Sequence, residues 1–436
     1  MSSVTSTKMR INTAEQFLES VAEPAYTALY LSYGKVDAWA NESCPDMANT
    51  STAGENEVWY NMIGGKRIYG NDLCLVIPRY NWAANTKYFA YDHMSTNLYD
   101  QTFYVLTSDF SVYKCISNNS SANSTVEPTS INPDSVTQTS DGYVWKYMYS
   151  VESSDQLRFI TDQYIPIRKI AADNGSLQWK VQEGAIEGAI FNIVIANSGT
   201  GYTNTSNLLV TITGDGKSAT VTANLNLTSQ TVSTLTLTDY GSGYTFANVD
   251  ISGGGGTGAV AKAIISPVGG HGSDPIYELG ASKVMINPTL KFTEDGVLPV
   301  TNDFRQIAIL KDPLTAEGVI VTNNAFRQAL TIKTQGSGNY SLDEIVYQGS
   351  SLSASAFKGE LLYWDEANGI AEIINTVGTI QPQSLIGATS STSRFVSNIV
   401  NKDLKERSGQ ILYINNLKAI TRSYDQTEDF KIVVKF

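Results

Sequence analysis

The stretches "NSGTGYTN" (Asn197–Asn204) and "YGSGYTFA" (Tyr240–Ala247) repeat the pattern Gly-x-Gly-Tyr-Thr within one chain. The first copy is followed by "VTITG" (Val210–Gly214) and the second by "VDISG" (Val249–Gly253). Each copy therefore reads as a strand, a Gly-x-Gly-Tyr turn, a polar link, a second strand, a Gly-rich turn and a strand of small residues. Two such units would bury, by stacking, a face that neither buries alone.

In this interpretation the glycines supply positive φ angles at tight turns, and Tyr202 and Tyr244 pack over those turns. The surrounding residues contain few aromatics, many Thr and Gly, and alternating patterns such as "SATVTANLNL" and "TVSTLTLT". We call residues 186–266 the Gly–Tyr module and predict that it is a β-repeat unit.

Two glycine-rich stretches in this module could instead bind phosphate. "GDGKS" (Gly214–Ser218) ends like a P-loop, but the position of the first motif glycine holds Thr211 and "ATVTANL" after it predicts a strand, not a helix. "SGGGGTG" (Ser252–Gly258) has a suitable composition, but neither a helix nor an acidic partner follows it. We interpret both stretches as turns.

The composition excludes several classes of protein. The chain has 436 residues, enough for two to four domains. Its net charge of −12 and its scattered Lys and Arg argue against nucleic acid binding. No run approaches the ~20 apolar residues of a membrane span, so we expect no membrane insertion, and no signal peptide is visible. Cys44, Cys74 and Cys115 are too widely spaced for a disulfide framework or a C-x-x-C metal site, which favours a reducing compartment.

The predicted secondary structure is mainly β. Only residues 12–26 ("NTAEQFLESVAEPAY", with a possible capping box of Thr13 and Gln16) and 401–409 ("NKDLKERSG") indicate helices. Runs of β-branched and aromatic residues predict strands, which include "TALYLSYG", "DLCLVIPRY" and "YVWKYMYSV". A second small β unit contains the strands "DEIVYQGS", "KGELLYWD" and "GIAEIINT", with a hairpin signal at Asn368-Gly369.

The residues that usually carry catalysis are sparse. His93 and His271 are the only histidines, each in a polar, turn-like context, and we expect both to be solvated loop residues. The carboxylate pairs Asp365/Glu366 and Glu428/Asp429 are adjacent in sequence, so in strands their side chains point to opposite faces. We therefore predict no enzyme and assign no catalytic, cofactor-binding or metal-binding residue, and no cofactor.

Several stretches resemble one known family. They are "YLSYGKVDAWAN" (Tyr30–Asn41), "VWYNMIGGKRIYGNDLCLVIPRYNW" (Val58–Trp82), "SDGYVWKYMYSV" (Ser140–Val151), "NDFRQIAILKDP" (Asn302–Pro313) and "GQILYINNLKAITRSYDQTEDFKIVVKF" (Gly409–Phe436). In this order they are similar to the baseplate wedge subunit of contractile-tailed bacteriophages, the gene product eight family. "DGYVWKY", "FRQI" and "DQTE" are the most specific parts. The resemblance covers roughly the first 180 residues, about 270–330 and the last 40.

The resemblance implies a structural virion protein of the tail baseplate. Members are mostly β, dimerise, join other wedge proteins and take part in the rearrangement that triggers tail contraction. It therefore implies a homodimer, other baseplate wedge proteins as partners, and assembly in the host cytoplasm. The 24 Tyr, 14 Phe and 6 Trp of this chain fit a protein with some aromatic residues at interfaces.

Together these observations predict a mainly β, multi-domain chain: a β-sandwich-like core, a short N-terminal helix and two inserted small β modules. The core would comprise residues 1–185, 267–335 and 389–436. The Gly–Tyr module, 186–266, and a small β-barrel-like module, 336–388, would be the insertions.

Two other functions remain open at this level. A glycan-binding tail-fibre or adhesin-type protein could bind sugars through the Gly-Tyr repeats, but such proteins often show long uniform repeats and this chain has two copies. A β-rich polysaccharide hydrolase could use an unrecognised carboxylate pair. We rank both below the structural wedge protein.

Overall fold

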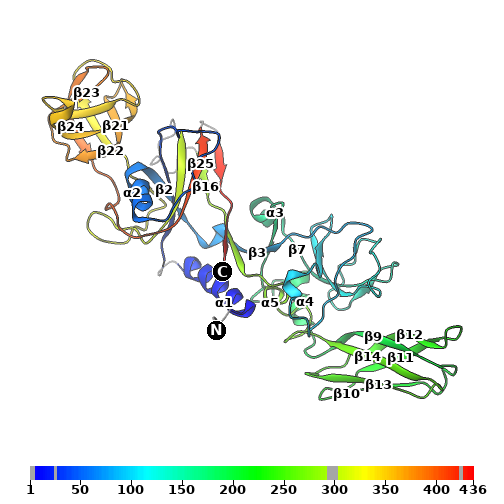
Figure 1. Cartoon of the computed structure of the whole chain (residues 1–436). Helices are drawn as coiled ribbons and strands as arrows, with labels where there is room; N and C mark the ends of the chain where they lie inside the picture. The colour runs from blue at the N-terminus through cyan, green and yellow to red at the C-terminus, as the bar shows by residue number, and fades with distance from the viewer. Residues whose placement is uncertain (1–4, 24–26, 292–302, 422–425) are drawn as a thin grey trace. The chain divides into compact units, whose positions relative to one another are not determined.

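The computed structural model describes residues 5–23, 27–291, 303–421 and 426–436. The chain divides into two compact units. Unit 1 comprises Met1–Glu15, Cys74–Met285 and Val433–Phe436, and unit 2 comprises Gln16–Leu73 and Ile286–Ile432. The predicted fold class is confirmed: the chain is mainly β, with several separate sheets and a short N-terminal helix (Figure 1). The strands predicted to form one core are distributed over both units.

Helix α1 (Thr7–Ala22) begins five residues before the predicted start. Ser6 caps it, because its Oγ accepts a hydrogen bond from the Met9 N–H at 3.3 Å. The predicted capping box is wrong: Thr13 lies within the helix, and its Oγ1 donates to the Met9 carbonyl at 2.9 Å. Residues 24–26 of the predicted helix lie outside the described residues.

Unit 2 contains a five-stranded antiparallel sheet in the order β18-β2-β1-β17-β25. Its strands are β1 (Leu29–Gly34), β2 (Met62–Ile68), β17 (Phe304–Lys311), β18 (Ala325–Arg327) and β25 (Gln410–Ile420). Helix α2 (Thr52–Asn61), which the sequence did not predict, packs Val58 and Trp59 against Tyr30, Leu310 and Phe326 of the sheet. A two-stranded sheet of β16 (Thr289–Lys291) and β26 (Thr427–Asp429) and the 3₁₀ helix η1 (Gly70–Asp72) complete this part.

The second part of unit 2 is a closed six-stranded barrel (Figure 1). In barrel order its strands are β19 (Leu330–Gln335), β22 (Ile370–Gly378), β21 (Ser355–Asp365), β20 (Ile345–Gly349), β23 (Ser384–Gly387) and β24 (Ser393–Val400), with η3 (Leu352–Ala354) before β21. The predicted 336–388 module contains only four of them, because closure requires β19 and β24 as well. The expected hairpin joins β21 to β22 through four residues, 366–369.

Outside the Gly–Tyr module, the described residues of unit 1 form two four-stranded sheets. One has the order β4 (Tyr104–Leu106), β5 (Ser111–Ser117), β7 (Val144–Ser150), β6 (Thr137–Gln138), and the other β27 (Ile432–Lys435), β15 (Lys283–Ile286), β3 (Leu73–Pro78), β8 (Tyr164–Ile167). Short helices connect them: α3 (Ser153–Phe159), α4 (Leu177–Glu183), α5 (Pro275–Leu279) and the 3₁₀ helix η2 (Leu98–Asp100). The first sheet buries an aromatic cluster, so most of the tyrosines here are core residues: Tyr88, Tyr113, Tyr143, Trp145 and Tyr147.

The Gly–Tyr module contains β9 (Ile190–Thr200), β10 (Leu209–Gly214), β11 (Thr220–Asn226), β12 (Thr231–Asp239), β13 (Ala247–Ser252) and β14 (Thr257–Ile265). The strands pair as β10-β13-β14-β9 and as β11-β12, and β12 also packs alongside β9. In three of the ladders, β10–β13, β11–β12 and β9–β14, a strand of the first copy pairs with a strand of the second. The two copies therefore bury one shared core, as the repeat predicts.

The Gly-x-Gly-Tyr repeats are turns whose tyrosines pack reciprocally. Tyr202, 2% exposed, lies against the β13–β14 turn of the second copy, where a Cβ on Gly256 would be 2.4 Å from the ring. Tyr244, 5% exposed, lies against the β10–β11 turn of the first copy, where a Cβ on Gly216 would also be 2.4 Å from the ring. The two stretches considered as phosphate loops are thus the surfaces that receive the rings.

Residues 401–409, predicted as a helix, do not form one. Leu404 is 3% exposed within the α2 cluster, and it forms an isolated β-bridge with Thr315. Its N–H donates to Gln328 Oε1 at 3.2 Å, and Ser408 Oγ accepts from the Leu314 N–H at 3.0 Å. These tertiary contacts hold the segment in an irregular conformation with a turn at residues 406–407, and they override its local helical propensity.

Candidate interaction sites

A buried ion pair anchors the chain where it leaves the Gly–Tyr module. Lys114 on β5 and Glu278 on α5 contact each other through Nζ and Oε2, with side chains 0% and 2% exposed. Glu278 Oε1 also accepts a hydrogen bond from the Gly272 N–H at 2.7 Å. Burial lowers the pKa of Lys114, and the Glu278 carboxylate opposes that shift. A buried charge of this kind is tolerated only while it is paired.

His271 lies beside this ion pair and is buried, so the expectation of a solvated loop residue is wrong for it. It is 2% exposed, and its ring contacts the edges of Tyr91 and Phe191, with centroid distances of 4.9 and 5.3 Å. Burial, then the charges of Lys114 and Lys146, hold its pKa well below the ordinary value. His271 is therefore neutral. His93 is exposed, as expected.

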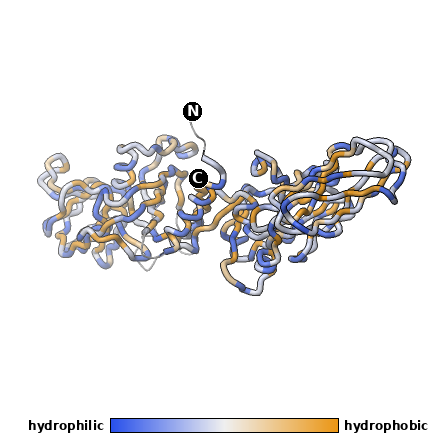
Figure 2. The backbone as a smooth tube through the Cα atoms, turned by 90° about the horizontal axis from the view of Figure 1, so that it is seen from below, coloured by the Kyte–Doolittle hydropathy of each residue, from blue (hydrophilic) through white to orange (hydrophobic). Residues whose placement is uncertain are grey.

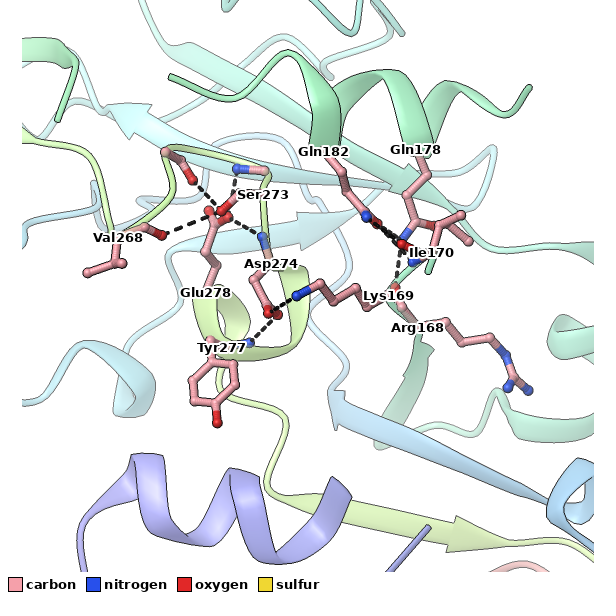
Figure 3. A network of polar contacts seen from close by, with 12 residues as sticks. Arg168, Lys169, Ile170, Gln178, Gln182, Val268, Ser273, Asp274, Tyr277 and Glu278 are labelled. Carbon is pink, nitrogen blue, oxygen red and sulfur yellow. Dashed lines mark hydrogen bonds and ion pairs between the residues drawn. The ribbon is translucent and has the colours of Figure 1, made fainter. Parts of the chain in front are cut away.

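Polar contacts around α5 fix the loop that follows the module (Figure 3). Asp274 accepts from the Tyr277 N–H at 3.2 Å, which caps α5, and pairs with Lys169 Nζ at 2.6 Å. Ser273 Oγ donates to the Gly270 carbonyl at 3.2 Å. In the same view Gln182 of α4 accepts from the Ile170 N–H and donates to its carbonyl, at 3.0 and 2.9 Å. The chain thus leaves the Gly–Tyr module through a hydrogen-bonded frame, not through a loose linker.

In unit 2, Arg305 holds the loop that covers part of the edge strand β25. Its Nε donates to Glu42 Oε1 at 2.7 Å, and its Nη1 donates to the Val36 carbonyl. Trp39 of this loop donates from its N–H to Glu42 Oε1 and from Nε1 to the Leu417 carbonyl on β25, each at 2.8 Å. The hydrogen bond from Arg305 is the largest cause that lowers the pKa of Glu42. Covering an edge in this way limits uncontrolled strand addition.

The stretches weighed for catalysis carry no assembled site in the described part of the chain. "GDGKS" lies between β10 and β11, where Lys217 forms a bridge with Ser242, and no helix follows it. Glu428 is buried and Asp429 exposed on β26, so they point to opposite faces. Asp365 accepts a hydrogen bond from the Asn368 N–H at 3.1 Å and closes a turn.

Two further observations concern the described ranges alone. Within them, His, Cys, Asp and Glu residues form no group of three that could hold a metal ion. No helix there is long and apolar enough to cross a membrane, and along the backbone apolar and polar segments alternate (Figure 2). The three cysteines are free, with Cys74 and Cys115 buried.

Comparison with known families gives one match. Residues 2–130 match the family model Phage-Gp8, described as "Bacteriophage T4, Gp8". Over this segment the chain is similar to the Gp8 family. The resemblance inferred from sequence is therefore confirmed, and the Gp8 match supports a structural protein of the bacteriophage baseplate wedge, a class that is not enzymatic. No curated protein matches the chain.

The segment matched to Gp8 runs from α1 through β5. It contains Glu42 and Lys114, but their partners Arg305 and Glu278 come from later in the chain. Sequence reasoning missed both ion pairs, although each has a signal. A lysine interrupts the apolar strand "SVYKCIS", and an arginine interrupts "FRQIAIL". A charge within a buried strand predicts a paired partner.

Proposed function

We propose that this chain is a structural subunit of a phage tail baseplate wedge. In this proposal it forms a homodimer, binds neighbouring wedge proteins, assembles in the host cytoplasm and takes part in the rearrangement that triggers tail contraction. The observation that carries the proposal is the Gp8 match over residues 2–130. The activity is binding, with no catalytic step.

Two sheets in the described part of the chain have edges that are closed or partly covered, which supports a subunit that assembles with a defined stoichiometry. The barrel closes on itself, and Trp39 and Glu42 cover part of the β25 edge. Open edges invite indiscriminate strand pairing, and these devices reduce it. Association would then proceed through side-chain surfaces, which can be selective and can rearrange between two states.

The glycan-binding alternative depends on exposed repeat tyrosines, and this fold buries them. It requires the repeat tyrosines to be available for stacking on sugar rings, but Tyr202 and Tyr244 are 2% and 5% exposed. Their rings lie on glycines of the opposite copy. No observation on the described residues favours that function over the wedge protein.

Two measurements test the proposal. Light scattering coupled to size-exclusion chromatography should give twice the chain mass of 47.4 kDa, and a trimer would instead favour a fibre protein. Phage lacking the gene should make tails without complete baseplates, and supplying the chain from a plasmid should restore them. Normal baseplates in the mutant phage would contradict the proposal.

A further inference from the structure

A small cavity in unit 2 lies where three elements meet: helix α2, the barrel strand β22 and the segment that follows β24. Its volume is about 70 Å³. It is lined by Asn56, Trp59, Tyr60, Thr376, Lys402, Glu406 and Arg407. By this measure a single water molecule needs about 10–15 Å³, so the cavity has room for a group of a few heavy atoms. Tyr60 is 50% exposed, and Glu406 and Arg407 are also exposed, so the cavity can be reached from solvent.

Most of the polar groups that line the cavity are hydrogen-bond donors without a partner in the chain. The Asn56 amide, the Tyr60 and Thr376 hydroxyls and the Arg407 guanidinium each bond to no other residue of the described ranges. Lys402 and Glu406 pair with each other at 2.7 Å. That pair largely neutralises itself, so the guanidinium of Arg407 is the uncompensated charge of the lining.

The backbone presents Arg407 in an unusual conformation. Its φ is 59°, in the left-handed region that residues other than glycine rarely adopt. Ser408, next in the chain, holds this turn: its Oγ accepts from the Leu314 N–H at 3.0 Å and donates to the Lys405 carbonyl at 2.6 Å. Strained, over-determined residues of this kind concentrate at binding sites.

The electrostatics favour a bound group near Arg407. Burial, then the charges of Glu360 and Asp37, raise the pKa of Tyr60 above its ordinary value. The Tyr60 hydroxyl therefore keeps its proton at neutral pH and can donate it to an acceptor. The same two carboxylates repel an anion from the Tyr60 side, so Arg407, whose charge has no partner in the lining, must hold the charge of the bound group.

We propose that this cavity is a carboxylate-binding site that takes an acidic side chain from a partner protein. Arg407 would bind both carboxylate oxygens, the geometry that guanidinium favours, and Tyr60 and Asn56 would donate the remaining hydrogen bonds. Carboxylate binding does not depend on the wedge role. Only the identity of the partner as a neighbouring wedge protein rests on the proposed function.

The test uses the full chain labelled with 5-fluorotryptophan, because Trp59 lines the cavity and the chain has only six tryptophans. The Trp59 resonance is assigned with Trp59→Phe. N-acetyl-glutamate amide, the probe for an acidic side chain, is titrated at constant ionic strength against chloride. We expect the chemical shift of the Trp59 resonance to change with probe concentration and to saturate, which gives a midpoint concentration. Arg407→Asn suits the left-handed backbone and removes the charge. It should raise this midpoint concentration at least about tenfold.

The matched control is Lys405→Ala. It removes one positive charge from the same segment, but Lys405 does not line the cavity, so the midpoint should stay unchanged. Tyr60→Phe should weaken binding by less than the Arg407 variant. Equal midpoints for Arg407→Asn and Lys405→Ala, or no saturable shift, would overturn the site. Inorganic phosphate could instead bind with a midpoint concentration at least about tenfold lower than that of the carboxylate probe. That result would assign the cavity to free phosphate and overturn the proposal that it binds an acidic side chain of a partner protein. Neither result alters the mass or baseplate tests of the wedge role.

Discussion

The Gly–Tyr module and the barrel both contain six strands, but they are held together differently. The barrel encloses a core of large apolar side chains, among them Leu330, Val346, Phe357, Leu361 and Ile373, all at most 5% exposed. The module has no comparable interior. Its strands β10 and β11 contain no fully buried residue, and much of its shared core is only partly buried.

The difference shows that a β module can depend on its ends instead of its centre. Burial of apolar area contributes about 25 cal/mol per Å², so the barrel gains most of its stability from its interior. The module has less to gain there and relies on Tyr202 and Tyr244 seated on glycine turns, and on the buried ion pair at its anchor. Mutations at these points should therefore separate the two regions.

The largest effect is expected for Tyr244→Ala. The ring fills the space above Gly216 and belongs to the module core, so its removal should lower the free energy of unfolding of the module by about 3–5 kcal/mol. Hydrogen exchange should show faster opening of β9–β14, with β19–β24 unchanged. The control is Phe246→Ala, an exposed aromatic of the same turn, which should cost about 0.5 kcal/mol or less. Equal losses for the two variants would show that the ring does not hold the turn.

Breaking the buried ion pair should have the next largest effect. Lys114→Met leaves Glu278 charged in a buried site and should cost about 3 kcal/mol, the low end for such pairs because the Gly272 N–H still binds the carboxylate. The double variant Lys114→Met/Glu278→Leu should recover much of this loss, since neither charge then remains buried. Urea unfolding measures both. A double variant no more stable than Lys114→Met would contradict an energetic role for the pairing.

The sequence predicted those features that depend on local pattern. The mainly β class, the strand runs and the role of the Gly-x-Gly-Tyr turns follow from alternation and from positive φ, which is 64° at Gly199 and 61° at Gly241. A barrel-like module was predicted for residues 336–388, but its two further strands, β19 and β24, were not included, because they are far apart in sequence and only their pairing reveals them as one sheet.

Burial of polar residues was also beyond prediction. His271 sits in "GGHGSD", a stretch that reads as a solvated turn, and it is buried only because Tyr91 and Phe191 from other elements pack on it. The cavity at Arg407 is likewise made by three segments that are separate in sequence. That the Gly–Tyr module and residues 336–388 are insertions stays a prediction.

A substitution in the barrel should have a smaller effect on stability, and this effect should be confined to the barrel. Arg394 Nε donates to Thr334 Oγ1 and its Nη1 donates to the Gly338 carbonyl, each at 3.0 Å, and the guanidinium lies 4.9 Å from the Trp364 ring centroid. Arg394→Met should cost about 2 kcal/mol. Hydrogen exchange should quicken in β19–β24 only. Lys358→Met, an exposed cation on β21, is the control and should be near neutral. Faster exchange in β9–β14 would show that the two regions are coupled.

The two regions should also differ in the sign of their response to acid. The pKa of His271 is held well below its unfolded value of about 6.5, because burial disfavours the charged ring. Its contribution to stability is therefore complete above pH 6.5 and is lost as the pH falls below 6.5, by up to about 1.4 kcal/mol per pH unit. In the barrel, burial raises the pKa of Glu360 and Glu372 above 4.5. Their unfavourable contribution disappears as the pH falls towards 4.5.

Acidification from pH 7 to 5 should therefore speed hydrogen exchange around α5 and around Phe191, the module residue that contacts His271. Exchange in β21 and β22 should not become faster. The rates are corrected for the intrinsic pH dependence of exchange. His271→Gln removes the titrating ring and should flatten the response around α5 at the expense of some stability at pH 7. His93→Gln is the matched control: His93 is exposed, and its pKa is lowered mainly by partial burial, so its variant should keep most of the response. If His271→Gln kept the full acid response, protonation of carboxylates and not of His271 would be its cause.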